Sequence, residues 1–138
     1  MSGKIGIIFC CSVEEKINPL EAAEHLKNNE ELYWSVPFGI REENLFFPIT
    51  GLIHITKDAV RYRCVIRGIK KYAPSDHLNP SKKPERWIKE QKNNPRQYKS
   101  TLIFEKIEPF DYDTKELKDI SGQRIKNPPR GYQKITLL

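Results

Sequence analysis

Short runs of β-branched and aromatic residues recur along this chain, and they constrain its fold more than any other feature. Lys4–Cys11 (KIGIIFCC) is a dense apolar run of the kind that forms a buried strand. In residues 59–72, apolar and basic side chains alternate, as expected for a half-exposed antiparallel strand. Similar patterns predict further strands at Glu43–Ile49, Gly51–Thr56, Ala59–Tyr72, Thr101–Ile107 and Tyr132–Leu138.

Short helices are predicted between these strands. Asn18 is expected to cap a helix that has Pro19 in its first turn and runs to about residue 29. A second helix is expected to open at Pro84, and one or two helical turns are expected within residues 112–120. Residues 33–39, which include Trp34, are expected to form a loop. The sequence therefore predicts an α+β fold, with a small mixed sheet that curls toward a barrel and is flanked by short helices.

Length and composition indicate one globular domain. The chain has 138 residues, of which 38% are hydrophobic and 30% are charged. No apolar run approaches the length of a transmembrane helix, and the start lacks the pattern of a signal peptide. We therefore expect a cytoplasmic protein that is not membrane-bound. We expect residues 1–138 to be a single nucleic-acid-binding domain, either complete or the N-terminal part of a longer protein.

The positive charge is concentrated in one segment. The net charge is +6, and residues 70–99 contain nine Lys and Arg residues but only three Asp and Glu residues. Four prolines interrupt this segment, at positions 74, 80, 84 and 95. A focused basic segment predicts a surface for a polyanion. The alternative is a solvated, lysine-rich loop.

The sequence offers no catalytic or metal-binding pattern. His25, His54 and His77 lie in no metal-ligand spacing and beside no candidate nucleophile, so structural or solvated roles are expected for them. The three cysteines fit neither a disulfide framework nor a four-ligand zinc site. Phosphate-binding glycine motifs do not occur. We predict that the protein is not an enzyme and that it needs no metal or cofactor.

Two tryptophans give a stronger lead. Trp34 follows an acidic helix end, and Trp87 lies among the cations of the basic segment. A tryptophan with basic neighbours is suited to stack on a nucleobase while the cations hold phosphate. Each tryptophan could instead anchor its segment to the core, and the sequence leaves both interpretations open.

Three elements in order resemble the EVE and YTH-like group of PUA-related domains. They are Trp34-Ser35-Val36, the run Leu45–Gly51 and a basic strand that ends at Val65–Ile69. The resemblance covers about residues 4–120. The chain departs from the EVE pattern at Glu42-Glu43-Asn44, where those domains usually have Gly-Asp, and at Pro48.

This resemblance implies a base-flipping reader of modified nucleic acid, more specifically of DNA that carries N6-methyladenine or a modified cytosine. The group includes specificity domains of McrB-type restriction proteins, so a C-terminal AAA+ motor domain and a nuclease subunit are expected partners. The implied cage residues are Trp34, Ser35, Trp87, Tyr33 and Phe38, and the implied base-edge contacts are Ser12 and Asn18. The candidate phosphate contacts are Arg61, Arg63, Arg67, Lys82, Lys83, Arg86, Lys89, Lys92 and Arg96.

Two other functions remain open at this stage. One is a PUA-like domain of the ASCH type, which binds RNA or hydrolyses modified nucleosides, although its G-x-K-x-x-E-x-R element does not occur here. The other is a protein-interaction module whose basic loop binds an acidic partner.

Overall fold

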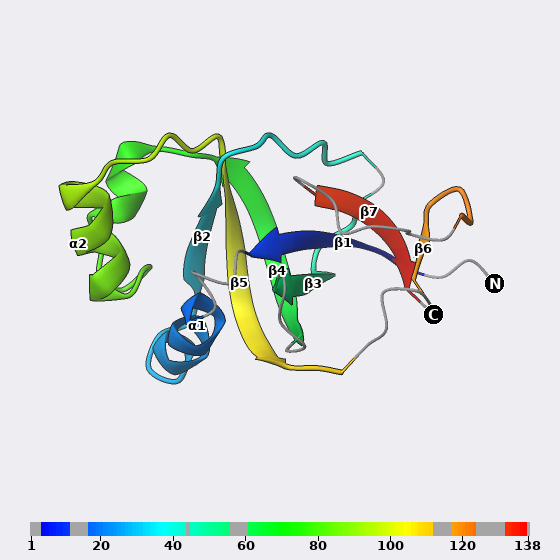
Figure 1. The fold of residues 1–138 in the computed structure, drawn as a ribbon, viewed down its shortest axis with the longest axis horizontal. Helices are drawn as coiled ribbons and strands as arrows, with labels where there is room; N and C mark the ends of the chain where they lie inside the picture. Colours follow the sequence, from blue (N-terminus) through cyan, green and yellow to red (C-terminus); the bar gives the residue numbers. More distant parts are fainter. Residues whose placement is uncertain are drawn as a thin grey trace.

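Seven strands form one mixed sheet in the computed structural model, and two helices lie at one end of it (Figure 1). The structure describes residues 4–11, 17–43, 45–55, 61–111, 117–123 and 132–137. The elements are β1 (Lys4–Cys11), α1 (Asn18–Leu26), β2 (Leu32–Val36), β3 (Ile49–Ile55), β4 (Arg61–Lys71), the 3₁₀ helix η2 (Pro74–His77), α2 (Glu85–Asn93), β5 (Ser100–Pro109), β6 (Lys118–Asp119) and β7 (Tyr132–Leu137).

The strand order in the sheet is β2-β5-β4-β3-β1-β7-β6. Only the β1–β3 pair is parallel, and the other pairs are antiparallel. Strands β2 and β6 are the two edges, and they do not pair with each other among the described residues. The prediction of an α+β protein with a mixed sheet is therefore confirmed. The expected barrel is not closed in the part of the chain that the structure describes.

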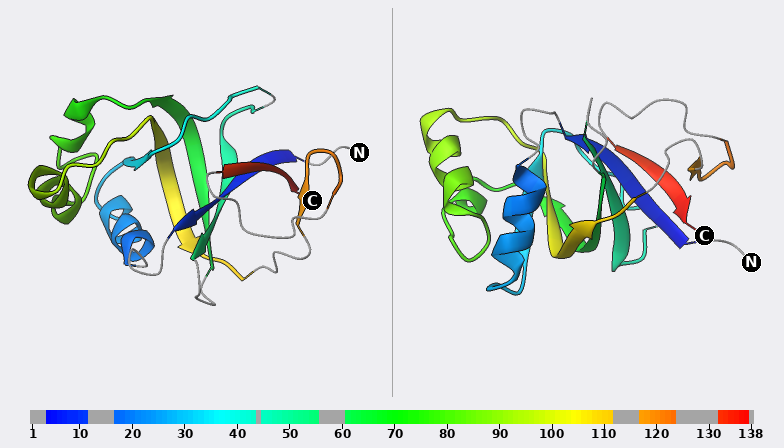
Figure 2. Two further views of the ribbon diagram at one scale, coloured as in Figure 1. Left: turned by 45° about the horizontal axis from the view of Figure 1, so that its top comes forward. Right: turned by 60° about the horizontal axis from the view of Figure 1, so that its bottom comes forward.

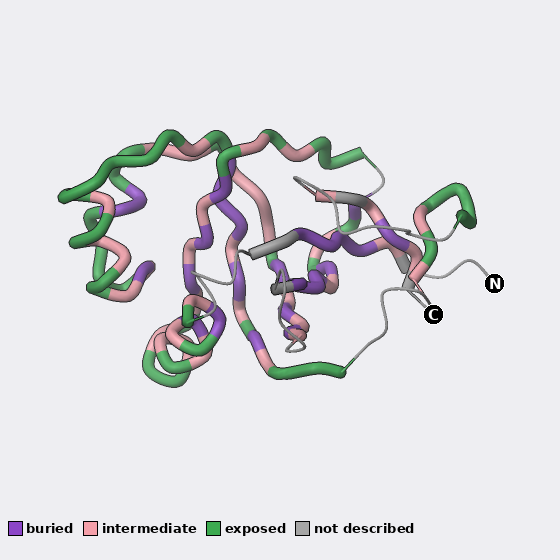
Figure 3. Tube along the Cα trace, in the orientation of Figure 1, coloured by how far each residue is buried: buried purple, intermediate pink, exposed green. Residues whose placement is uncertain are grey.

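The main core lies on one face of the sheet. It contains Phe9 from β1, Ile53 from β3, Ile66 from β4 and Phe104 from β5, and Ala22 of α1 packs onto it. The neighbouring residue Ile8 points to the opposite face, because successive side chains of a strand alternate. Buried positions follow the strands, whereas α2 and the chain beside it are largely exposed (Figure 3). The core therefore forms around the sheet, and α2 lies outside it.

Two predictions about the middle of the chain are wrong. The strand expected at residues 43–49 is absent from the described residues 43 and 45–48, and β3 begins only at Ile49, directly after the cis Phe47–Pro48 unit. Pro48 has no N–H to donate to a sheet, which is consistent with a strand that starts after it. The loop expected around Trp34 is strand β2, because it pairs with β5 and buries Leu32, Trp34 and Val36 on alternate positions.

The other elements lie close to the predicted ones. Helix α1 begins at Asn18, but its N-cap is Ile17 and not Asn18. Helix α2 extends further than expected, to Asn93. The helical turns predicted within residues 112–120 fall partly outside the described residues, and Lys118–Asp119 is a short strand. The alternation predicted for β4 is confirmed, since Tyr62, Cys64 and Ile66 are all buried.

The basic segment is the long connection between β4 and β5. It leaves the sheet after Lys71, passes through η2 and α2, and returns to β5, which pairs with β4 (Figure 1). On its way it contacts the free edge of β2, where the backbone N–H of Tyr33 donates to the carbonyl of Lys82 at 2.7 Å. On the other side of β2, the N–H of Lys99 donates to the carbonyl of Val36 at 2.9 Å and extends the pairing with β5. The bond to Lys82 covers part of an edge strand that would otherwise be open to another chain.

The close contact of β3 with β4 gives a stability prediction. A Cβ at Gly51 would lie 2.7 Å from Sγ of Cys64 and 2.8 Å from Cδ1 of Ile66, and both side chains are buried. We expect Gly51→Ala to lower the free energy of unfolding by about 1–3 kcal/mol, because the core cannot expand without strain. Urea unfolding followed by tryptophan fluorescence measures this change.

Gly68→Ala is the matched control on the neighbouring strand β4. A Cβ at Gly68 would have only Ile103 Cδ1 nearby, at 3.9 Å, which is ordinary van der Waals contact. We expect this variant to stay within about 1 kcal/mol of the unmodified protein. Equal stabilities of the two variants would contradict the close packing at Gly51.

Candidate functional site

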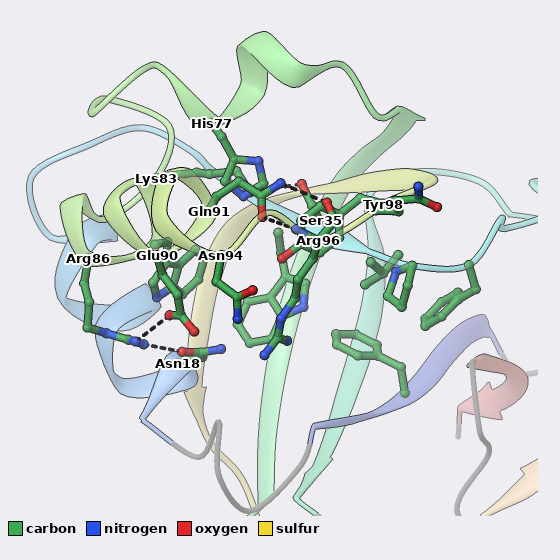
Figure 4. Close-up of a pocket in the computed structure, with 17 residues that line it drawn as sticks. Asn18, Ser35, His77, Lys83, Arg86, Glu90, Gln91, Asn94, Arg96 and Tyr98 are labelled. Carbon is green, nitrogen blue, oxygen red and sulfur yellow. Dashed lines mark hydrogen bonds and ion pairs between the residues drawn. The ribbon is translucent and has the colours of Figure 1, made fainter.

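A pocket of about 290 Å³ lies between β2 and the basic segment (Figure 4). Its residues come from parts of the chain that are far apart in sequence: β1, the start of α1, β2, η2, α2 and the loop before β5. The lining residues are Phe9, Asn18, Trp34, Ser35, Val36, Pro37, Phe38, His77, Lys83, Arg86, Trp87, Glu90, Gln91, Asn94, Arg96, Gln97 and Tyr98.

Trp34 connects this pocket to the core. Its ring stacks on Phe104 with centroids 5.3 Å apart, and Phe9 and Trp87 contact it edge-on at 6.0 and 5.4 Å. Only 7% of Trp34 is exposed. Trp34 therefore anchors β2 in the core, as one of the two interpretations predicts, and it also forms one wall of the pocket.

Helix α2 forms the opposite wall, and one carboxylate of α1 holds it there. Nε of Arg86 donates to both carboxylate oxygens of Glu21, at 2.8 and 2.9 Å. The indole N–H of Trp87 donates to the same carboxylate at 3.2 Å. Figure 2 shows the two helices side by side at the same end of the sheet. The half-buried Trp87 is thus fixed by its ring contact with Trp34 and by its hydrogen bond to α1.

The rim of the pocket is closed by a loop that folds back onto α2. The side-chain amide of Gln91 donates to the carbonyl of Arg96 at 2.9 Å and accepts from its N–H at 3.0 Å. This pair of bonds holds residues 94–97 against the helix. Behind the loop, Tyr98 stacks on His77 with centroids 5.2 Å apart. The pocket therefore has aromatic walls and a rim of amide and guanidinium groups.

A buried polar network lies beside these walls. Nζ of Lys83 is 3.0 Å from Oγ of Ser35 and 2.9 Å from Nε2 of His77. Nδ1 of His77 is 2.8 Å from the hydroxyl of Tyr72. Only 1% of Lys83 is exposed. A lysine amine that sequence analysis assigns to phosphate contact is thus buried at the pocket wall.

Burial changes the protonation of both basic groups in this network. Loss of hydration lowers the pKa of Lys83 to about 7, and the carboxylate of Asp76 opposes this change only in part. Burial, and then the nearby charge of Lys83, lowers the pKa of His77 to about 4. At neutral pH the imidazole is therefore neutral, and Lys83 is poised between its charged and neutral forms.

The pocket brings together eight of the predicted site residues. Trp34, Ser35, Trp87 and Phe38 from the predicted cage line it, as do Asn18, Lys83, Arg86 and Arg96. Tyr33 does not line it, because alternation along β2 turns its ring to Lys70 and Lys82, whose Nζ atoms lie 5.1 and 5.6 Å from the ring centroid. Ser12 lies outside the described residues.

Several predicted phosphate contacts are already paired with acids. Arg63 pairs with Glu108, and Arg67 pairs with both Glu31 and Glu105. Lys82 pairs with Glu31, and its hydrogen bond lowers the pKa of that carboxyl. None of these cations, nor Arg61, lines the pocket. The charge count of the sequence therefore overstates the positive charge that is available to a ligand.

Exposed lysines remain on α2 and at the two ends of the connection between β4 and β5. Lys89 and Lys92 project from α2, and Lys71 and Lys99 flank the ends of the connection. No ion pair is recorded for these four lysines among the described residues. Their charges are therefore not paired with an acid among the described residues.

Sequence reasoning missed several pocket residues. His77 is buried and hydrogen-bonded, as expected for a structural histidine, but the sequence did not indicate that it also lines the pocket and contacts Lys83. Tyr98 carries the same signal as Trp87, an aromatic residue among cations, and that signal could have found it. Nothing in the sequence distinguishes Gln91 or Asn94, because their role depends on how the loop folds back onto α2.

Comparisons of the chain with models of known protein families, with curated proteins and with solved structures find no match. Within the described residues, no group of three or more His, Cys, Asp or Glu side chains is arranged to hold a metal ion. None of the described helices is long and apolar enough to cross a membrane.

The buried Lys83 gives a prediction about stability and pH. Its pKa is about 7 in the folded protein, against 10.5 for an ordinary lysine, so above pH 7 the unfolded chain binds a proton that the folded protein has released. We expect this group to make the free energy of unfolding rise with pH, by up to about 1.4 kcal/mol per pH unit.

Urea unfolding between about pH 7.0 and 8.5 measures this rise. Measurements stop at about pH 8.5 because burial raises the pKa of the Cys64 thiol. At higher pH this thiol ionises in the unfolded chain but not in the folded protein, which lowers the free energy of unfolding. Lys83→Met should remove the rise, and Lys89→Met, at an exposed position on α2, should keep it. A wild-type stability that falls over this interval would contradict a neutral Lys83 in the folded protein.

Proposed function

We propose that this protein is a non-catalytic reader of modified nucleic acid, and that the pocket beside Trp34 and Trp87 receives a base flipped out of its strand. Its ligand is then DNA that carries N6-methyladenine or a modified cytosine. Its role is that of the specificity module of a restriction system, as the resemblance to EVE and YTH-like domains implies.

The observation that carries this proposal is the pocket itself. Aromatic rings of Trp34, Trp87 and Tyr98 lie around a cavity of about 290 Å³, together with side-chain amides and cations. A flipped base requires this combination, since its faces stack on aromatic rings and its edges form hydrogen bonds. Helix α2, which forms one wall of the cavity, also carries the exposed residues Lys89 and Lys92 outside the pocket lining, and these are candidates for contacts with the phosphates of the bound strand.

The energies are compatible with base flipping. Extrusion of a base from a duplex costs a few kcal/mol, and stacking on one aromatic side chain contributes about 1–3 kcal/mol. A buried methyl group adds only about 0.8 kcal/mol. Recognition of a methylated base therefore depends on how the cavity shape excludes other bases as well as on burial.

The test depends on the choice of tryptophan. Trp34 is buried against Phe9 and Phe104, so Trp34→Ala is expected to cost about 3–5 kcal/mol, a large part of the stability of a typical domain. Trp87 is half-buried and lies on a helix outside the core. Trp87→Ala is therefore the variant that removes a pocket wall with the least effect on the fold.

We expect wild-type protein to prefer one modified duplex over its unmodified counterpart, and Trp87→Ala to lose about 5- to 100-fold in affinity for that duplex. The measurement is fluorescence anisotropy with matched duplexes that are unmodified or carry N6-methyladenine or 5-methylcytosine. Matched RNA strands distinguish a DNA reader from an RNA reader.

Tyr33→Ala is the matched control, because Tyr33 is an aromatic residue of β2 that does not line the pocket. We expect it to keep the preference of the wild type. The proposal is wrong if all duplexes and RNA strands bind equally and Trp87→Ala changes none of them. Binding of an acidic protein in the presence of competing DNA would then favour an interaction module.

The exposed lysines of α2 give a separate prediction. We expect the double variant Lys89→Ala, Lys92→Ala to weaken binding to every duplex by a similar factor and to lower the slope of log affinity against log salt by about 1–2. Titrations between about 50 and 200 mM salt measure the slope. The ratio of modified to unmodified binding should not change, because phosphate contacts position a ligand without reading its bases.

A further inference from the structure

Three polar side chains of the pocket are joined through one guanidinium. Nη1 of Arg86 donates to Oε2 of Glu90 at 2.8 Å, and Nη2 donates to Oδ1 of Asn18 at 2.6 Å (Figure 4). Its Nε donates to Glu21 of α1. Asn18, Arg86 and Glu90 all line the pocket. Arg86, a predicted phosphate contact, is therefore already used within the protein, where it holds its two neighbours in place.

These bonds determine what the two neighbours present to a ligand. An arginine side chain only donates, so it takes an oxygen from each partner. The amide of Asn18 is thereby oriented, with its oxygen on Arg86 and its two N–H donors turned away from it. The second carboxylate oxygen of Glu90, Oε1, has no recorded hydrogen bond among the described residues. The pocket therefore offers a ligand an acceptor on Glu90 and a donor on Asn18.

A ligand in the pocket has access to both groups. The side chain of Glu90 is 51% exposed, and Asn18 is half-buried. Glu90 lies one helical turn beyond Trp87 on α2, and residues with this spacing are neighbours on a helix surface. Both residues line the same cavity. A base that stacks against Trp87 therefore has Glu90 beside its edge.

A carboxylate is an unfavourable group in a site for a polyanion, because it repels phosphates. It is favourable where a base presents an N–H, since a carboxylate accepts from the exocyclic amine of cytosine in the grooves of DNA. Hydrogen bonds to an ionised acceptor are also stronger than neutral ones. N6-methyladenine keeps one N–H on its exocyclic nitrogen and 5-methylcytosine keeps two. In both bases a ring nitrogen beside the amine is an acceptor that suits the amide N–H of Asn18.

We propose that Glu90 selects the base in this pocket by accepting a hydrogen bond from its exocyclic amine. This inference rests on the proposed function, because it names the group by which the same pocket recognises its base. Asn18 donates to the ring nitrogen beside the amine. Arg86 is a positioning residue, because it acts through the side chains of Glu90 and Asn18.

Two matched pairs of bases isolate this N–H. 6-Methoxypurine keeps the ring and the methyl group of N6-methyladenine but has an oxygen in place of the N–H. 5-Methylpyrimidin-2-one is 5-methylcytosine without its amine. Each base is placed at one unpaired position of the same short DNA duplex, so that the free energy of unpairing is small for all four. Binding is measured by fluorescence anisotropy.

In the pair whose modified base the protein prefers, we expect the base with the N–H to bind roughly tenfold more tightly than its analogue. Glu90→Ala should lose this preference while keeping the circular dichroism spectrum of the wild type, because the side chain is half-exposed. Glu85→Ala is the matched control, since it removes the same charge from α2 at an exposed position that does not line the pocket. Both variants should bind every duplex more tightly, as expected from the loss of one negative charge, but only Glu85→Ala should keep the preference.

A preference for the N–H that survives in Glu90→Ala would overturn this inference, and so would equal binding of a base and its analogue by the wild type. Either failure is distinguishable from failure of the proposed function. If Trp87→Ala weakens binding of a base and its analogue alike and neither is preferred, the pocket receives bases and Glu90 does not select them. If no base binds better than an abasic duplex and Trp87→Ala has no effect, the proposed function itself is wrong.

Discussion

The packing of Trp34 between the sheet and α2 is the contact on which the rest of the structure depends. One side of its ring stacks on Phe104 of the core, and Trp87 meets it edge-on from α2. Aromatic pairs of this geometry contribute about 0.5–1.5 kcal/mol beyond the area that they bury. Because α2 contains no fully buried residue of its own, this contact and the bonds of Arg86 to Glu21 help to hold it against the sheet, together with the bonds of Gln91 to Arg96. The pocket exists because α2 is held close to the sheet without filling the space between them.

The polar network beside Trp34 gives this pocket its chemistry. A buried lysine without a carboxylate contact is costly, and its lowered pKa reflects that cost. Replacement of such a group by an apolar residue is often neutral or stabilising in other proteins. Its presence at a pocket wall, held by Ser35 and His77, agrees with the ligand-binding role that we propose for the pocket.

Much of the fold follows from local sequence patterns, and the errors have physical causes. Dense apolar runs identify β1, β3, β4, β5 and β7, because their burial depends on period and composition. β2 was missed because Trp34, Ser35 and Pro37 have the composition of a loop, and its pairing with β5 involves residues about 66 positions away. A strand was wrongly predicted before Pro48, because the run of aromatic residues there is typical of strands. Pro48 has no backbone N–H to donate to a neighbouring strand, and this decides against one.

The sequence by itself determined that this is a small α+β protein with a concentrated basic segment. It also singled out Trp34 and Trp87 as aromatic residues that lie near charged segments. It could not determine which cations are available, because Arg67, Lys82 and Arg86 are paired with acids that are distant in sequence. Nor could it show that Lys83 is buried, since a lysine in a basic run has the pattern of a surface residue. Only the tertiary structure decided these points, because the charge, hydration and accessibility of a side chain depend on long-range neighbours, whereas strand and helix patterns are local.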